Sequence, residues 1–323
     1  MVKYIIYLAK VFLFLLVYSN SFATCTYNGT VLDTSNGTGT PVNDSSEGVG
    51  DQCDDMPDFY SLDFYRMSLC SANVNPVGGA ADFSSCTDML NVDTPINAVI
   101  NRTAETSLNA PDFTLQSGTY GYMVAIISSK MGIKHSFEVN TAVDTYDSGS
   151  SLNGAGTYCW TKNNFLSTIT NEPGVVTPHG TTVNGGISDI SNFECSNTAS
   201  DVSNAEFTYE AISVLDGDGS SCAGGLGANG DRVSMGLLGT GLTTGRLLQN
   251  DGETDATGCT NSAKILWVIE LTNSVTITPT SQVTMFFKTT DSVSIDFDNT
   301  AVAAPILLKA GANPPQAYIS ASE

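Results

Sequence analysis

KILWVIELTNSVTITPTSQVTMFFKTTDSVSIDFD, residues 264–298, contains three successive strand patterns. Residues 264–271 form a continuous apolar run, which is typical of a strand buried on both faces of a sheet. Residues 282–288 are rich in strand-forming residues, and residues 292–298 alternate strictly between polar and apolar. The alternation places every second side chain on one face, so this stretch predicts β structure.

Strand patterns recur earlier in the chain. Residues 119–127 and 133–139 are separated by a short Ser-Ser-Lys-Met-Gly segment, which predicts a hairpin-like connection. Residues 206–215 and 303–309 add two more strands, and helical periodicity is limited to a turn at 87–90. Long Gly-, Ser-, Thr- and Asn-rich stretches lie between these patterns. The predicted fold class is all-β, an antiparallel β-sandwich of jelly-roll or immunoglobulin-like type with long disulfide-tethered loops.

The first 23 residues have the order of a secretory signal peptide. Lys3 and Lys10 precede an uninterrupted apolar run, and small residues occupy Ser21 and Ala23 before the expected cleavage point. The run is too short to span a bilayer, and no comparable run follows it. We therefore expect secretion to the cell surface or extracellular space, with the periplasm as an alternative, and no transmembrane segment after residue 23.

Eight cysteines, an even number, follow the predicted leader and indicate a disulfide framework. They lack the short C-x-x-C spacing of zinc sites. Sequence alone permits 105 connectivities, and we predict that sequence neighbours pair. The predicted pairs are Cys25–Cys53, Cys70–Cys86, Cys159–Cys195 and Cys222–Cys259.

The net charge limits the partners that the chain can bind, and the distribution of cysteines bears on the number of domains. The mature chain has a net charge near −23, because the leader holds two of the 12 basic residues and none of the 33 acidic ones. Such a charge repels nucleic acid and anionic lipid. Residues 24–323 are predicted to form one elaborated sandwich. Because four cysteines lie on each side of Gly149, two smaller β domains that divide near this residue are the alternative.

Catalytic signatures are weak in this sequence. It has no G-x-S-x-G nucleophile elbow, and its two histidines have structural interpretations. His135 lies in a predicted strand, where it is expected to face solvent or a neighbouring strand, and His179 lies in a predicted turn between Pro178 and Gly180. We predict no catalytic residue, and the protein is interpreted as non-enzymatic.

Carboxylates and aromatic residues nevertheless leave a carbohydrate-related function open. Acidic residues cluster at Asp54, Asp55, Asp58 and Asp63, and a glycosidase requires two suitably spaced carboxylates. Trp160 lies in an aromatic and polar segment that can stack on a sugar, although a tryptophan beside Cys159 is more often part of a core.

Calcium is the one cofactor with support at the level of residues. Asp216 and Asp218 are separated by one residue and flanked by glycines, as in calcium-binding loops, while the full EF-hand pattern is absent. A solvated turn explains the same residues.

These observations favour a structural or interaction protein at the cell surface or outside the cell, such as an adhesin-like or filament-forming subunit. Its expected partner is a second copy of itself, a surface protein or a glycan. A secreted carbohydrate-binding or carbohydrate-hydrolysing protein is the first alternative. A binding protein for a small ligand, with an enclosed apolar pocket, is the second.

Overall fold

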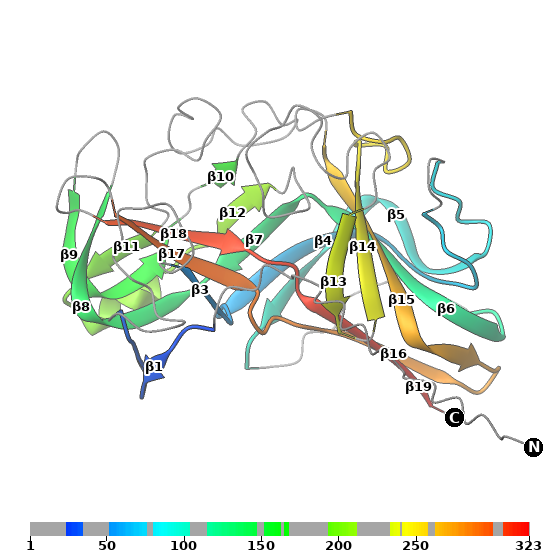
Figure 1. Ribbon diagram of the computed structural model, residues 1–323, viewed down its shortest axis with the longest axis horizontal. Coiled ribbons are helices and arrows are strands. Elements are labelled where there is room, and N and C mark those ends of the chain that lie inside the picture. The colour runs from blue at the N-terminus through cyan, green and yellow to red at the C-terminus, as the bar shows by residue number, and fades with distance from the viewer. Residues whose placement is uncertain are drawn as a thin grey trace, which may run out of the picture.

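The computed structural model describes residues 24–34, 52–75, 80–103, 115–146, 152–162, 165–167, 193–211, 233–239, 241–257, 262–299 and 306–322. Within these residues the fold is all-β, with three sheets and one short 3-10 helix, η1 (Ala199–Asn204). Figure 1 shows an elongated molecule in which the two large sheets follow one another along the long axis. No helix in the described ranges has the length and apolar character needed to cross a membrane. The predicted leader lies outside these ranges.

The first sheet has eight strands and occupies the left half of Figure 1. They are β1 (Tyr27–Asn28), β2 (Val31–Leu32), β3 (Gln52–Asp55), β8 (Ser136–Tyr146), β9 (Leu152–Thr161), β11 (Phe193–Ser196), β17 (Val293–Asn299) and β18 (Ile306–Ala312). Their main order is β1-β2-β8-β18-β17-β3, with β9 beside β8 and β11 beside β9. The sheet is mixed, because β2 and β18 pair with β8 in parallel whereas the other pairs are antiparallel.

The second sheet has nine strands. They are β4 (Phe59–Cys70), β5 (Cys86–Asn101), β6 (Gly118–Ser128), β7 (Lys130–Lys134), β10 (Phe165–Ser167), β12 (Thr208–Ala211), β13 (Val233–Leu238), β14 (Gly241–Leu248) and β15 (Lys264–Ile277). Their main order is β10-β12-β7-β4-β6-β15-β14-β13, and β5 pairs with β4. One end of β4 pairs with β7 and the other with β6, so β4 holds the two parts of the sheet together.

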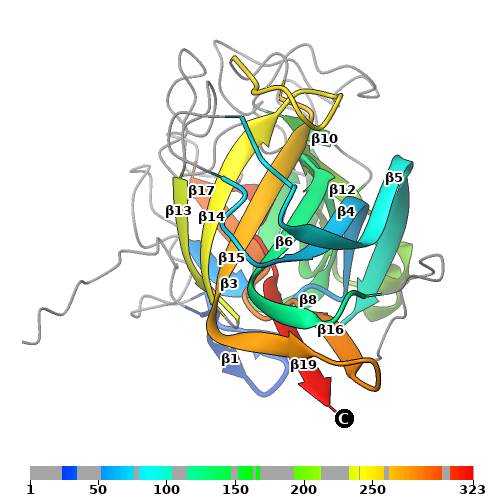
Figure 2. The same ribbon diagram turned by 90° about the vertical axis from the view of Figure 1, so that its right-hand side faces the viewer.

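The third sheet is a two-stranded antiparallel ribbon of β16 (Gln282–Lys288) and β19 (Gln316–Ser322). Figure 2 shows the two strands at the lower end of the molecule, close to β15. Side chains of β16 alternate between exposed and partly buried, as expected for a strand that covers a core with one face.

The continuous apolar run of β15 is buried on both faces, as its sequence predicts. Ile265, Trp267 and Ile269 belong to the main core, which also contains residues of the first sheet. Leu266 and Val268 face the opposite side and join a smaller apolar cluster. In β17, the alternating apolar residues enter the main core, which confirms the expected orientation of that strand.

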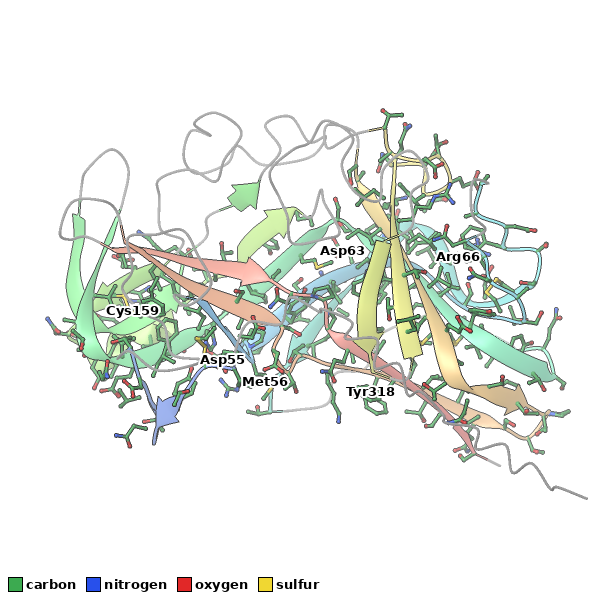
Figure 3. All side chains as sticks on the ribbon, viewed as in Figure 1. Asp55, Met56, Asp63, Arg66, Cys159 and Tyr318 are labelled. Carbon is green, nitrogen blue, oxygen red and sulfur yellow. A yellow bond between two sulfur atoms is a disulfide. The ribbon has the colours of Figure 1, made fainter. Side chains whose placement is uncertain are left out.

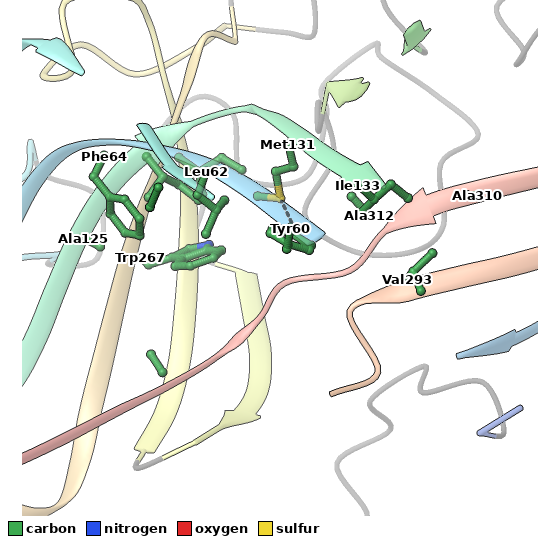
Figure 4. Close-up of a cluster of buried hydrophobic side chains, with 14 of the residues drawn as sticks. Tyr60, Leu62, Phe64, Ala125, Met131, Ile133, Trp267, Val293, Ala310 and Ala312 are labelled. Carbon is green, nitrogen blue, oxygen red and sulfur yellow. Dashed lines mark hydrogen bonds between the residues drawn. The ribbon is translucent and has the colours of Figure 1, made fainter. Parts of the chain in front are cut away.

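Tyr60 joins the two large sheets at the centre of the main core. Its ring is fully buried, and its hydroxyl lies 3.0 Å from the sulfur of Met131 and donates to the carbonyl of Asn313 at 2.9 Å. Figure 4 shows Tyr60, Leu62 and Phe64 from β4 on the side of Trp267, with the first-sheet residues Val293 and Ala310 nearby. A buried tyrosine needs a hydrogen-bond partner, and here the segment after β18 supplies it.

The segment that joins β4 to β5 covers part of the outer face of the second sheet. Val74 and Phe83 from this segment pack against the smaller apolar cluster. Arg66 lies 3.9 Å above the ring of Phe83, and buried Arg246 donates to Asn75 at 3.0 Å. This cover extends over β6, β14 and β15, whereas no described element covers the outer face where β12, β7, β4 and β5 are neighbours.

Three of the four predicted disulfides are confirmed: Cys25–Cys53, Cys70–Cys86 and Cys159–Cys195. Two of them join residues that are directly opposite on paired strands, β4 with β5 and β9 with β11. The first bridge ties the N-terminal segment to β3. Cys222 and Cys259 lie outside the described residues.

Several local predictions are wrong. β6 and β7 do not form a hairpin with each other; they succeed one another and both pair with β4. Between β6 and β7, the Ser129 amide donates to the carbonyl of Ala263, and the Lys130 amide donates to the hydroxyl of Ser128. Residues 87–90 form part of β5 and not a helical turn, because pairing with β4 satisfies their backbone.

Candidate functional site

A shallow pocket of about 280 Å³ opens on the uncovered outer face of the second sheet. We call it the outer pocket. Its lining residues are Ser61, Asp63, Asn97, Val99, Lys130, Phe207 and Tyr209. They come from β4, β5, β7 and β12 and the residue before β12, which are distant in sequence but adjacent in the sheet.

Strand register explains why a hollow forms here. Tyr209 is opposite Gly132, Gly132 is opposite Ser61, and Ser61 is opposite Val99. Because directly paired residues share a face, these four form one row across the sheet. The two central positions carry the smallest side chains, and the Tyr209 ring lies over Gly132, so the hollow is beside that ring, above Ser61.

Gly132 lies beneath the Tyr209 ring, next to the residues that line the outer pocket. A Cβ at this position would lie 2.7 Å from Cε1 of Tyr209 and 3.1 Å from Cβ of Ser61. The tyrosine ring therefore occupies space over the glycine that any other residue would fill. The arrangement holds Tyr209 near the sheet surface beside Phe207, with the ring centroids 6.1 Å apart.

Polar groups of the outer pocket are joined by hydrogen bonds. The side-chain amide of Asn97 donates to the hydroxyl of Ser61 at 2.9 Å and to Oδ1 of Asp63 at 2.7 Å. Lys130 lies with its ammonium 4.3 Å from the centroid of the Tyr209 ring, a cation–π distance. Burial, followed by the negative charge of Asp63, raises the pKa of the Tyr209 hydroxyl, which keeps the phenol neutral at physiological pH.

A second group of titratable residues surrounds His135, between β7 and β8. The ring is 1% exposed, with Nε2 3.2 Å from Oδ2 of Asp55 and Nδ1 3.8 Å from Oδ2 of Asp58. Both nitrogens are buried, and neither has the alignment of a regular hydrogen bond. Asp55 also accepts a short hydrogen bond from Tyr27, and Asp58 forms an ion pair with Arg102 at 3.0 Å.

Local electrostatics favour an ionised Asp55. Burial alone raises the pKa of this carboxyl, but the facing His135 ring, the Tyr27 hydroxyl and the Met56 amide lower it, and the net shift is downward. Burial and then the negative charge of Asp55 raise the pKa of the Tyr27 hydroxyl.

The His135 cluster has the residue types of an acid–base site but not the access. Its imidazole is sealed from solvent, and both ring nitrogens face carboxylates. A general base needs hydrogen-bond reach to a substrate proton, which this enclosure prevents. The expectation that His135 faces solvent is wrong, because its ring is buried, whereas the alternative that it faces a neighbouring strand agrees with its contact to Asp55 at the end of β3. The cluster connects β1, β3 and the segment after β3 with His135, the single residue between β7 and β8.

Other residues singled out from the sequence are placed as follows. Trp160 is only 5% exposed and packs in the interior beside the Cys159 disulfide, so it does not offer a sugar-binding surface. Asp216, Asp218 and His179 lie outside the described residues, so the calcium prediction remains untested. Within the described ranges, no group of three or more His, Cys, Asp or Glu side chains has the arrangement of a metal site.

Acidic residues that are neighbours in sequence separate into different places. Asp55 and Asp58 face His135, whereas Asp63 lies in the outer pocket, and Figure 3 shows Asp55 and Asp63 apart from one another. Sequence reasoning missed Tyr209, Asn97 and Lys130. The one available signal was the polar alternation of Ser61 and Asp63 with the apolar residues of β4, which indicates an outward polar face.

Together these features define a disulfide-bonded, all-β protein with a polar and aromatic pocket on a sheet face that none of its described segments covers. Comparison of the chain with known protein families, curated proteins and solved structures finds no match.

Proposed function

We propose that this chain is an exported, non-enzymatic interaction protein, adhesin-like in its mode of action, that works by surface contact. The outer pocket is the observation that carries this proposal. It combines aromatic side chains with hydrogen-bonded polar groups on a sheet face that no described element covers. Binding sites characteristically join apolar surface with a few fixed polar groups.

Two observations favour contact over hydrolysis. The titratable His135 cluster is enclosed, so it has no access to a substrate. Asp63 is the single carboxylate among the described residues that line the outer pocket, whereas glycoside hydrolysis ordinarily requires two. Asp63 together with the Asn97 amide is suited to orient a ligand.

Export and architecture belong to the same proposal. The signal peptide predicted over residues 1–23 and the three disulfides support maturation in an oxidising compartment. We also infer that the two large sheets act as the layers of an elaborated sandwich, which a core shared between them supports.

A binding assay on the secreted, oxidised protein tests the proposal. Labelled protein is incubated with intact cells, isolated surface glycans and surface proteins, and parallel samples are analysed for cleavage products. We expect saturable binding without product release. Protein-dependent turnover of a polysaccharide, or failure to bind any surface material or to self-associate, would contradict it.

Self-assembly is a second candidate, supported by the β16–β19 ribbon. Phe286 is 42% exposed and stacks on Tyr318 with ring centroids 5.0 Å apart. Among the described strands, β16 pairs only with β19, which leaves its other edge for strand addition.

The net charge opposes such assembly at low ionic strength, and added salt screens this repulsion. Light scattering over a salt series is expected to show larger particles for the wild type than for a Phe286→Asp variant. Monomeric wild-type protein at every salt concentration would exclude a filament-forming role.

A further inference from the structure

We propose that the outer pocket binds a neutral saccharide, a ligand class that rests on the proposed interaction function. Hydroxyl groups of a sugar both donate and accept hydrogen bonds, and its C–H faces are weakly apolar. The pocket supplies partners for each of these features: a carboxylate, an amide, a hydroxyl, an ammonium group and two aromatic rings.

Size limits the ligand to a small unit. The volume of about 280 Å³ lies just below the range of about 300–1,000 Å³ that is usual for drug-sized ligands. Because the depression is bounded by Tyr209 on one outer strand and Val99 on the other, it suits one sugar ring.

Polar groups are held in place before a ligand arrives. Asn97 bridges Ser61 and Asp63, so the amide and the carboxylate fix one another's orientation. Within the described part of the chain, Oδ2 of Asp63 and Oδ1 of Asn97 have no hydrogen-bond partner, which leaves two oriented acceptors for sugar hydroxyls. Preorganised groups lose little conformational entropy on binding, which favours affinity for a small ligand.

Aromatic side chains provide the apolar part of the site. The Tyr209 ring is held over Gly132, and Phe207 lies beside it. The face of an aromatic ring carries partial negative charge, whereas C–H groups of a sugar carry partial positive charge, so the two surfaces attract. A neutral phenol at Tyr209 adds a hydroxyl that can donate or accept.

The charges of the pocket and of the whole protein favour a neutral sugar over an acidic one. Asp63 and Lys130 have opposite charges, so the described lining of the pocket is neutral overall. The rest of the protein is strongly acidic and repels anions. Binding of a neutral sugar should therefore depend only weakly on salt, since no net charge is neutralised.

The test compares two sets of glycans on the secreted, oxidised full protein. A glycan array with neutral and acidic oligosaccharides selects the best ligand, and calorimetric titration then gives its affinity at low and high salt. We expect the best ligands to be neutral and their affinity to change less than about two-fold with salt.

Three variants locate the site. Asn97→Ala and Tyr209→Leu are each expected to weaken binding at least about ten-fold, because each removes a fixed contact at the centre of the pocket. Asn91→Ala is the matched control, since Asn91 is an exposed residue of the same strand, β5, whose amide contacts Asp88 and not the pocket. Thermal unfolding and thiol titration verify that each variant is folded and oxidised.

The outcomes separate this inference from the proposed function. Saccharide binding that survives both pocket variants would overturn the site, and selective binding of acidic sugars or of a surface protein would overturn the ligand class. In each case the interaction function would stand. A protein that binds no surface material and does not self-associate would overturn both.

Discussion

At the scale of single residues, we expect Asp55 to make the free energy of unfolding depend on pH. Its pKa is lower in the folded protein than the ordinary value of about 3.9, so the folded state favours the ionised carboxylate. The resulting stabilisation is present above that value and is lost as the pH falls through the folded pKa. We expect Asp55→Asn to lower the free energy of unfolding at pH 7 by roughly 1–3 kcal/mol, with a difference that shrinks below pH ~4.

Urea denaturation of the wild type and Asp55→Asn from pH 3 to pH 7 measures this difference. Asp82→Asn is a suitable control, because the Asp82 carboxylate is solvent-exposed and accepts a local hydrogen bond from Ser84. A pH-independent difference between the wild type and Asp55→Asn would show that the substitution acts through packing and not through the charge.

Arg246 is the second residue with a testable energetic role. Its side chain is fully buried, forms an ion pair with Asp255 and donates to Asn75. Arg246→Met leaves the amide and the carboxylate without this donor, so we expect a loss of roughly 2–4 kcal/mol in the free energy of unfolding.

Arg66→Met is the control for Arg246→Met. Arg66 is more exposed and pairs with a partly exposed Asp88, so a loss of only about 1 kcal/mol is expected. Equal losses for the two variants in urea denaturation would show that the burial of Arg246 contributes nothing.

At the scale of elements, the Cys70–Cys86 bridge holds the segment between β4 and β5 over the smaller apolar cluster. The bridge closes a sequence separation of 16 residues. A disulfide limits the freedom of the unfolded chain, and a loop of this length corresponds to about 3 kcal/mol. We expect a Cys70→Ala/Cys86→Ala double variant to lose about that much stability in urea denaturation.

Limited proteolysis of the same double variant reports where the effect occurs. New cleavage is expected between residues 71 and 85, since the cover is then held by non-covalent contacts, such as the Ser71–Ser85 backbone hydrogen bond and the packing of Val74 and Phe83. Unchanged stability and an intact segment would mean that these contacts suffice without the bridge.

At the scale of the whole molecule, we expect the two large sheets to unfold together. Both sheets pair strands from either side of Gly149, as in β3 with β17 and β6 with β15, and one core contains residues of both. The chain has only two tryptophans, and each reports on one sheet: Trp160 in β9 and Trp267 in β15. In each of the variants Trp160→Phe and Trp267→Phe, fluorescence of the remaining tryptophan should give the same midpoint as circular dichroism of that variant. Fluorescence and circular dichroism midpoints that differ within one variant would show independent units.

Much of the fold follows from local patterns in the sequence. Alternation in residues 292–298 predicts β17, and the apolar run at 264–271 predicts β15. In both cases the spacing of apolar residues indicates which faces of the strand are buried, even when the neighbouring strands are unknown. Pairing of sequence-neighbouring cysteines predicts the three observed disulfides. In contrast, the long β5 was missed because its residues show no strong alternation, and it is a strand by virtue of pairing with β4. β19 was also missed, although Ala317, Ile319 and Ala321 alternate with Tyr318 and Ser320.

Only the tertiary structure reveals the candidate site. Ser61, Asn97, Lys130 and Tyr209 are far apart along the chain, and their meeting depends on strand order and register, which carry no local signal. The surroundings of His135 likewise depend on tertiary structure, which brings Asp55 and Asp58 to its ring. Local residue types determine which segments can form strands, whereas the pocket arises from long-range pairing that places the Tyr209 ring over Gly132 and brings Ser61 and Asn97 beside it.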